Sequence, residues 1–371
     1  MDANPPAQWS LPSLEQLVHH LLDQFDEVIG PVAHDGVIRL RPLTSSADIP
    51  TGVADEQEAA TYRLLSTGSR LRFSYGPGPD SLKAIVHPPS TPVWTMRRRD
   101  GSIIIDQARH QVTRRAVIGT RACDLRALEV LERTQTGGPH PDPAFAARRA
   151  GLFLVAIDCE HPSPTCFCDT ADGGPVATRG FDLALTELEG PHGVSYLVRA
   201  GTDAGGAVVD ALGLEVAPAD HVRIAERTRD QCRDEFIREM PAGAATAVRQ
   251  PDHPRWAEVA ERCLTCGNCT AVCPTCFCTD MDDAVGLDGE TATRTRVWDS
   301  CFSMSYSQLG EHAHRATPLS RYRQWLSHKV GTWHDQFGES GCVGCGRCIT
   351  WCPVGIDLTA EIEALAQEVP A

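Results

Sequence analysis

Two runs of cysteine in the C-terminal third of this 371-residue chain have a spacing that favours iron–sulfur chemistry. In each run, three cysteines separated by two residues are followed, three residues later, by a Cys-Pro pair. The first run is Cys263, Cys266, Cys269 and Cys273, before Pro274, and the second run is Cys342, Cys345, Cys348 and Cys352, before Pro353. The short gaps let one loop wrap a cubane with three thiolates, and the proline ends the turn. The pattern therefore predicts two [4Fe–4S] clusters.

In runs of this type the fourth cysteine ligates the cluster of the other run. We therefore expect one cluster on Cys263, Cys266, Cys269 and Cys352. We expect the other on Cys342, Cys345, Cys348 and Cys273. Structural zinc sites are the alternative, because CxxC pairs also bind zinc, but such sites usually use two pairs with a longer spacer. Three cysteines at successive two-residue gaps, followed by Cys-Pro, favour iron–sulfur clusters over zinc sites.

Four further cysteines are expected to meet at one edge of a sheet. Apolar segments at 116–119 and 151–157, with a helical pattern at 124–134 between them, predict a strand–helix–strand unit with parallel strands. The residues that follow the two strands include Cys123, Cys159, Cys166 and Cys168, called the rim cysteines below. Ligands bind at the carboxyl ends of strands in such sheets, and helix N-termini favour thiolates. Our hypothesis is a third iron–sulfur cluster, with structural thiols, zinc or a Cys166–Cys168 disulfide as alternatives.

Three cysteines in the long segment between the two runs have no assigned role. They are Cys276, Cys278 and Cys301, called the insertion cysteines below. The segment PTCFC that contains the first two repeats the PTCFC that contains Cys166 and Cys168, which indicates similar local geometry. The insertion cysteines have no obvious fourth ligand, and they could instead cover a cluster edge or complete the site of the rim cysteines.

Other parts of the chain give weaker signals. An amphipathic helix is predicted at 11–29 and a charged helix at 219–240, where Cys232 is expected to have no ligand role. Strands are predicted at 36–40 and 70–74, and an acidic loop or helix start at 55–58. The segment 75–83 resembles a phosphate loop but lacks the GxxxxGK(S/T) spacing, so a turn is expected. The alternative is that Lys83 faces an anion or a partner. His328, Lys329 and His334 lie in an aromatic tract for which packing is the simplest role, with tuning of a cluster potential or binding of a partner as the alternatives.

The predicted organisation is an α/β domain followed by a ferredoxin-like α+β module. The α/β domain covers 1–240, a linker covers 241–255, and the dicluster module covers 256–371 with an insertion at 274–341. Sixteen cysteines in clustered spacing, without a recognisable secretory signal in the first ten residues, indicate reduced thiolates that bind iron in the cytoplasm. The net charge of −15 argues against nucleic acid or an anionic membrane as a partner.

The motifs also support a family resemblance. The chain resembles the β subunits of cytosolic nickel–iron hydrogenases of the sulfhydrogenase type, and is similar to the A subunit of anaerobic sulfite reductase. The C-terminal segments that carry this resemblance are CLTCGNCTAVCPTCFC, VWDSC, YRQWLSHKVGTWHDQFG and SGCVGCGRCITWCPVGID. The N-terminal segments are IPTGVADEQEAATYRL, GTRACDLRALEVL and GFDLALTEL.

This resemblance implies an electron-relay subunit without a substrate site of its own. Such a subunit passes single electrons between a flavin-containing, NAD(P)H-reactive subunit and the small and large subunits of a nickel–iron hydrogenase. In the sulfite or sulfur reductase alternative, the acceptor is a sirohaem subunit. Two further alternatives are substrate reduction at an unusual cluster on the insertion cysteines and a zinc-stabilised interaction module. The sequence leaves the choice of complex, NADH or NADPH, and the direction of electron flow open.

Overall fold

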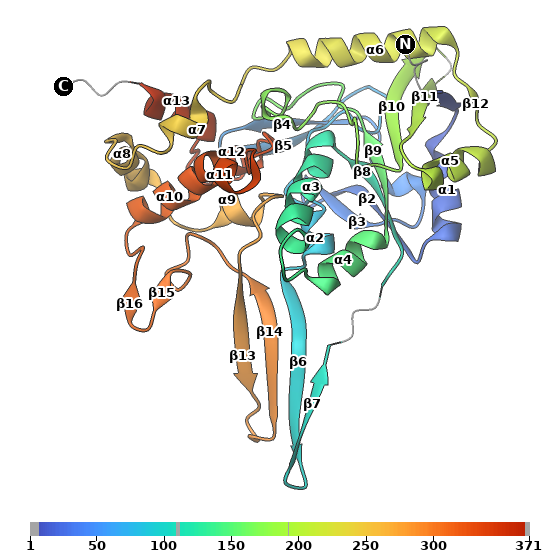
Figure 1. Ribbon diagram of the computed structural model, residues 1–371. Helices are drawn as coiled ribbons and strands as arrows, with labels where there is room; N and C mark the ends of the chain where they lie inside the picture. Colours follow the sequence, from blue (N-terminus) through green and yellow to red (C-terminus); the bar gives the residue numbers. More distant parts are fainter. Residues whose placement is uncertain (1–6, 109–111, 192, 368–371) are drawn as a thin grey trace.

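The computed structural model describes residues 7–108, 112–191 and 193–367. Residues 1–6, which belong to the segment without a recognisable secretory signal, lie outside the described residues. A mixed eight-stranded sheet with the order β12-β1-β11-β10-β9-β8-β2-β3 forms the body of the molecule (Figure 1). Its strands are β1 (Trp9–Leu11), β2 (Glu27–His34), β3 (Val37–Pro42), β8 (Arg115–Thr120), β9 (Leu152–Ile157), β10 (Leu183–Gly190), β11 (Gly193–Ala200) and β12 (Glu215–Val216).

The four central strands, β2, β8, β9 and β10, pair in parallel, and the outer strands are antiparallel. β8 leads through α3 (Ala122–Thr136) and α4 (Pro143–Ala150) to β9, so the predicted strand–helix–strand unit is confirmed. Every residue of β9 is buried, as expected for a strand covered on both faces. This unit places Cys123 and Cys159 at the carboxyl ends of neighbouring strands.

Helices cover both faces of the central sheet. Side chains of β9 alternate between two cores, with Val155 packing on the side of α1 (Leu14–Gln24) and Leu154 on the side of α3 and α4. The remaining helices of the N-terminal half are α2 (Lys83–Val86), α5 (Asp203–Ala211) and α6 (Ala219–Asp234), with 3-10 turns at Ser46–Asp48 and Asp169–Ala171. The sheet therefore provides a rigid support for the loops at its edge.

Several local predictions are wrong. The helix predicted at 11–29 ends at Gln24, because the following residues pair as β2, and the helix predicted at 219–240 ends at Asp234. The acidic segment at 55–58 belongs to β4 (Val53–Glu58), which pairs with β5 (Thr61–Ser66). The segment 70–74 is not a strand, because the N–H groups of Arg72 and Phe73 donate to the Glu187 carboxylate instead of a strand ladder.

Short helices of the C-terminal half enclose a second core around Trp256, Tyr322 and Trp325. They are α7 (Ala244–Ala247), α8 (Arg255–Arg262), α9 (Asn268–Ala271), α10 (Pro318–Leu326), a π-helical turn (Ser327–Thr332), α11 (Trp333–Phe337), α12 (Arg347–Thr350) and α13 (Leu358–Ala366). The segment 241–255, predicted as a linker, contains α7. Its residues Ala244 and Ala247 are buried in the second core, so this segment packs against the module.

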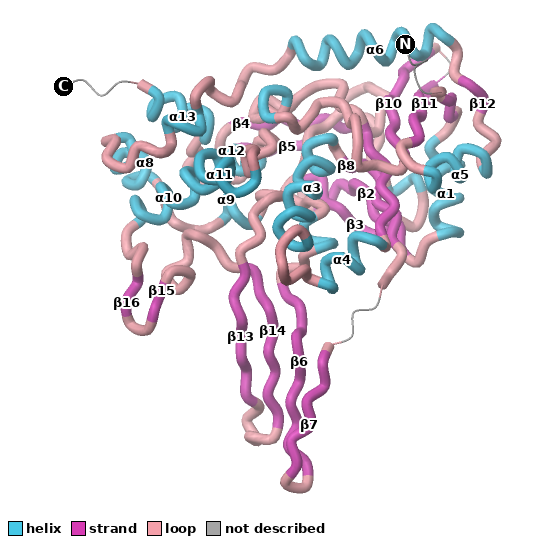
Figure 2. Tube along the Cα trace, in the orientation of Figure 1, coloured by secondary structure: helices cyan, strands magenta, loops and turns pink. Residues whose placement is uncertain are grey.

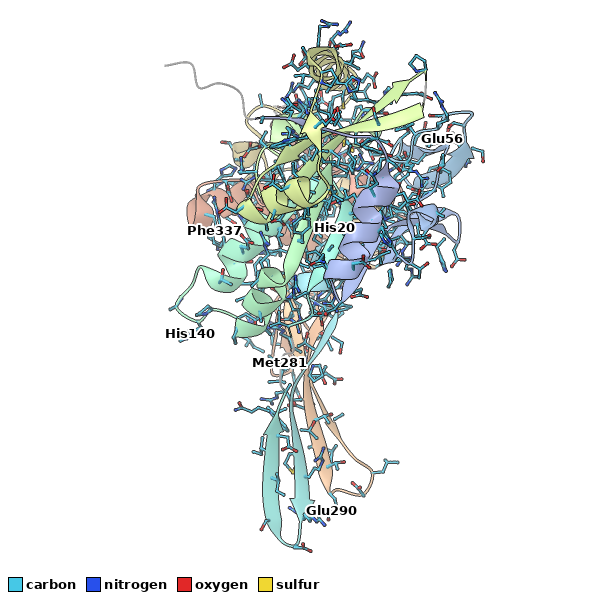
Figure 3. The ribbon with its side chains drawn as sticks, turned by 90° about the vertical axis from the view of Figure 1, so that its right-hand side faces the viewer. His20, Glu56, His140, Met281, Glu290 and Phe337 are labelled. Carbon is cyan, nitrogen blue, oxygen red and sulfur yellow. The ribbon has the colours of Figure 1, made fainter. Side chains whose placement is uncertain are left out.

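A four-stranded antiparallel sheet, called the arm below, projects from the body (Figure 2). It has the order β13-β14-β6-β7 and consists of β6 (Ser90–Arg99), β7 (Ser102–Gln107), β13 (Thr279–Val285) and β14 (Thr291–Trp298). Met281 lies near the base of the arm and Glu290 near its far end (Figure 3). A small separate hairpin pairs β15 (Gln308–Leu309) with β16 (His312–Ala313). Because β6 precedes the first run and β14 follows it, the arm joins the two halves of the chain.

Candidate iron–sulfur centre

Cysteines of both runs line one cavity in the C-terminal module. Phe302, Tyr322 and Trp325 contribute to the wall of this cavity. The cysteines that line it are Cys263, Cys266, Cys269, Cys348 and Cys352. Burial raises the pKa of the Cys263 and Cys269 thiols, and the charge of Cys352 raises both further. The structure thus brings the last cysteine of the second run to the first run.

Local backbone geometry holds this arrangement. The loop between α8 and α9 turns through Gly267, whose positive φ of 74° suits glycine. The side-chain amide of Asn268 donates a hydrogen bond to the backbone carbonyl of Trp351. The N–H group of Ile356 donates to Cys352 Sγ at 3.4 Å. These bonds fix Cys352 against the loop that contains the first run.

The other three cysteines of the second run lie near Cys273. Burial raises the pKa of Cys342, Cys345 and Cys348, and the charge of Cys273 raises each of them further. Cys273 Sγ lies 3.3 Å from Thr275 Oγ1 and accepts a hydrogen bond from Lys329 Nζ at 3.3 Å. Cys273 thus lies with the second run and Cys352 with the first run, while the crossed ligation itself stays a prediction.

The four rim cysteines come together beside the second run. Burial raises the pKa of Cys168 well above its usual value, and the charges of Cys123, Cys166 and Cys159 raise it further. Cys166 Sγ donates to the backbone carbonyl of Cys345 at 3.8 Å. Cys232, which the sequence suggested was isolated, is also buried, and the charges of Cys159 and Cys166 add to the raised pKa that burial gives it. The rim cysteines therefore form a third group next to the second one.

Two glycines of the second run allow this close approach. A Cβ on Gly344 would lie 2.5 Å from the Phe167 carbonyl oxygen, and one on Gly346 would lie 2.5 Å from that of Thr165. The N–H group of Phe167 also donates to the Gly344 carbonyl at 2.9 Å. These two glycines of the second run therefore allow its close contact with the PTCFC loop of the rim cysteines.

Buried arginines lie beside the rim cysteines and the second run. Arg121, at the N-terminus of α3, lies 3.9 Å from Cys159 Sγ and donates to the backbone carbonyls of Phe73 and Tyr75. Arg347 forms a 2.9 Å ion pair with Asp124, and the two side chains are 2% and 8% exposed. Burial lowers the pKa of Arg347, but the charges of Asp124 and Cys345 raise it above its usual range. Arg121, Asp124 and Arg347 carried no sequence motif that marked them as functional.

The chain has only two lysines among its 34 lysine and arginine residues, and both are buried beside cysteines. Lys83 Nζ donates to the carbonyls of Thr270 and Ala271 and lies 4.0 Å from the centre of the Trp298 ring. Lys329 Nζ donates to Cys273 Sγ, to Thr275 Oγ1 at 2.9 Å and to the Gly341 carbonyl at 3.4 Å. The rarity of lysine is a sequence signal that could have drawn attention to these positions.

The chemistry around Lys329 fits a thiolate-bound cluster. Burial lowers its pKa, but the charges of Cys273, Cys276 and Cys342 raise it well above the usual value, so the side chain stays charged. A buried ammonium group is costly unless an anion lies nearby. Within the described residues, neither lysine has a carboxylate at ion-pair distance. The thiolate form of Cys273, which a cluster ligand adopts, supplies the missing negative charge.

The insertion cysteines lie near Lys329 and form two separate contacts, Cys276 with Cys273 and Cys278 with Cys301. Cys276 donates to Cys273, and this bond lowers the pKa of Cys273. A hydrogen bond from Cys301 lowers the pKa of Cys278 to about 6, and the Tyr306 hydroxyl donates to the same sulfur at 3.2 Å. Within the part of the chain that the structure describes, no three His, Cys, Asp or Glu side chains are arranged to hold a single metal ion. Cys276 thus lies beside Cys273 of the second-run group, whereas Cys278 contacts Cys301 and lines a pocket with Cys266 of the first run. No ligand role is assigned to the insertion cysteines.

These features define an iron–sulfur electron-transfer protein. Residues 262–356 match the family model described as a 4Fe-4S dicluster domain. The sulfhydrogenase 2 subunit beta of Pyrococcus furiosus is 34% identical over 247 residues, which are 65% of this chain and 71% of that protein. No solved structure matches the chain. Of the helices in the described ranges, none has the length and apolar composition that a membrane crossing requires.

The chain belongs to the family of sulfhydrogenase β subunits. It is accordingly an iron–sulfur electron-transfer subunit of a multi-subunit complex, with a dicluster module in its C-terminal third. The family resemblance drawn from the motifs is thus confirmed.

Proposed function

We propose that this chain relays single electrons between a flavin-containing, NAD(P)H-reactive subunit and the nickel–iron subunits of a cytoplasmic hydrogenase. The single observation that carries this proposal is the series of three adjacent cysteine groups. The charge of Cys269 in the first-run group acts on Cys348, and Cys345 of the second-run group contacts the rim cysteine Cys166. A [4Fe–4S] cluster supplies one-electron chemistry when it is bound. Three groups in a row suit a relay better than a substrate site.

We assign the two crossed cysteine sets to two [4Fe–4S] clusters and the rim cysteines to a third. Support for the third assignment comes from three buried thiols and the half-buried thiol of Cys159, which share one edge of the sheet with the Arg121 cation. A buried cation beside thiols favours the thiolate form that iron requires. The chain's own residues then hold each site, exclude water from it and place the second-run site between the other two.

The two ends of the series present different surfaces to partners. At the first-run end, Cys266 is exposed, and Leu264, 61% exposed, lies beside it. At the rim end, a cavity of about 530 Å³ is lined by charged residues that include Arg126, Glu129 and Arg179. A Cβ on Gly174, in the wall of this cavity, would lie 3.1 Å from Cys168 Sγ. Different surfaces at the two ends fit different donor and acceptor subunits.

The first test is the iron and sulfide content of the anaerobically purified chain, with EPR of the reduced protein. We expect about twelve irons per chain, corresponding to three cubanes. Cys123→Ala should lower this to about eight. Cys232→Ser is the matched control, because this buried thiol is close to the same group and should leave the iron content unchanged. About eight irons in the wild type would refute the third cluster, and zinc without sulfide would refute the relay.

Co-purification of the intact complex tests the partners. We expect a flavin subunit and nickel–iron subunits to accompany the chain, and the isolated chain to pass electrons to dyes without turning over substrate. A sirohaem subunit in their place would identify the complex as a sulfite or sulfur reductase. Turnover of substrate by the isolated chain would contradict the relay and favour chemistry at the insertion cysteines.

A further inference from the structure

Lys329 is the only one of the two lysines that contacts a sulfur atom. Its side chain is 6% exposed and that of Lys83 is 2% exposed, so the two differ little in burial. Lys83, which comes from the N-terminal half, caps the last carbonyls of α9 and lies over the Trp298 ring. Its bonds explain it as a contact between the two halves of the chain. The bonds of Lys329 lie within the C-terminal module, and one of them is to Cys273.

The backbone around Lys329 places it at this sulfur. The residue lies in the π-helical turn Ser327–Thr332, which interrupts the path from α10 to α11. Single π-helical turns inside α-helices are frequently found at functional sites. The carbonyl of Lys329 accepts a hydrogen bond from the N–H group of Gly341, directly before the second run. The turn therefore ties both the backbone and the side chain of Lys329 to the second-run group.

Electrostatics indicates what a charge at this place does. Reduction adds one negative charge to a cluster, and its potential depends on nearby charge, hydrogen bonds to sulfur and exposure to solvent. Lys329 supplies both a positive charge and an N–H···S bond, and it is shielded from water, which would weaken them. Arg347, another cation near this group, forms an ion pair with Asp124. The charge of Lys83 also acts on Cys273, but of the two lysines only Lys329 adds a hydrogen bond to that sulfur.

We propose that Lys329 is a positioning residue that raises the reduction potential of the cluster on Cys342, Cys345, Cys348 and Cys273. The cluster in the middle of the series then holds an electron more readily than it would without this charge. This inference rests on the proposed cluster ligation and adds to it the residue that sets the potential of one cluster. Lysine suits the role because its charge is compact and its three N–H donors can reach a sulfur and two oxygens together.

The test compares the midpoint potentials of four variants of the full chain by redox titration monitored with EPR. Lys329→Met and Lys329→Gln remove the charge, and Lys329→Arg retains it. Lys83→Met is the matched control, because it removes an equally buried charge that is bonded to carbonyls. In the neutral Lys329 variants we expect the reduction equilibrium of one cluster to fall at least tenfold, about 59 mV for a one-electron couple. The shift should be smaller in Lys329→Arg and in Lys83→Met.

The outcomes separate this inference from the proposed function. Neutral variants that keep wild-type iron content and an unchanged potential would overturn the role of Lys329 and leave the relay intact. A shift in Lys329→Arg or Lys83→Met as large as in the neutral variants would also overturn it. Loss of one cluster from both neutral variants but not from Lys329→Arg would support the need for charge, whereas loss from all three would indicate packing. A wild-type chain without iron and sulfide would refute the ligation itself, and this inference with it.

Discussion

At the scale of single residues, the rim group and the second-run group are each accompanied by a buried cation. Arg121 lies beside the rim cysteines, and Lys329 and Arg347 lie beside the second-run group. The first-run group instead has an aromatic wall and an exposed cysteine, Cys266. Because burial alone raises the pKa of these thiols, the cations offset part of the cost of keeping thiolates inside the protein.

Crossed ligation makes a residue-scale prediction that single substitutions do not test. Cys273→Ala and Cys342→Ala should each remove about four irons, and the double variant should lose no more than either, because both serve one cluster. Cys273→Ala combined with Cys263→Ala should remove about eight, because these residues serve two clusters. The measurement is iron and sulfide content after anaerobic purification. If Cys273 and Cys263 together cost only one cluster, each run holds its own.

At the scale of secondary structure, short helices and loops perform the positioning. α9 and α12 have four residues each and follow glycines with a positive φ, Gly267 and Gly346. Helices of this length gain little stability from their own hydrogen bonds, so tertiary contacts hold them. The rim cysteines depend on the long buried strands β8 and β9. The site thus combines a rigid sheet edge with loops that fold around it.

A glycine pair tests whether the approach of the two loops matters. Gly344 and Gly338 have φ of 66° and 75°, but only Gly344 has backbone atoms within 3 Å of an added Cβ. Gly338→Ala should therefore lower the free energy of unfolding by about 1 kcal/mol, because of its backbone conformation alone, and leave the clusters in place. Gly344→Ala should cost more and lower the iron content, because the second run and the rim loop must separate. Denaturation midpoints and iron content would check this, and equal effects in both variants would contradict it.

At the scale of the whole molecule, the two halves of the chain form one folded unit. β6 and β14 pair in the middle of the arm, Thr350 donates to Gln57 at 2.9 Å, and Arg347 donates to the Gly78 carbonyl. At the base of the arm, His87 stacks on Trp298 with ring centres 6.3 Å apart, and the Trp298 indole donates to the His87 carbonyl. The relay is therefore built across the boundary that the sequence suggested between two domains.

His87 makes this interface sensitive to pH. Burial lowers its pKa from 6.5 to about 4, and the charges of Arg296 and Lys83 contribute. The folded state therefore keeps His87 neutral, whereas the unfolded chain takes up a proton below pH 6.5. The contribution of His87 to the free energy of unfolding is complete above pH 6.5. It is lost as the pH falls towards 4, by about 3 kcal/mol in total.

The comparison is between wild type and His87→Phe, a variant that keeps an aromatic ring for stacking on Trp298. Urea denaturation midpoints, measured anaerobically by tryptophan fluorescence between pH 7.5 and 4.5, should fall more steeply for the wild type. Parallel curves for the two proteins would show that His87 does not contribute to the pH dependence.

The sequence by itself determined the chemistry: the spacing of two cysteine runs, the strand–helix–strand unit and the family. These are local patterns, in which neighbouring residues already specify the geometry. The spacing of the runs already led us to expect Cys273 beside the second run. The tertiary structure alone decided that the rim cysteines touch Cys345 and that Lys329 reaches a sulfur. The tertiary structure also determined the arm, in which β6 pairs with β14, a strand about 200 residues further along the chain. Such contacts depend on which buried surfaces and charges find each other in the folded chain, and no periodicity along the sequence records that.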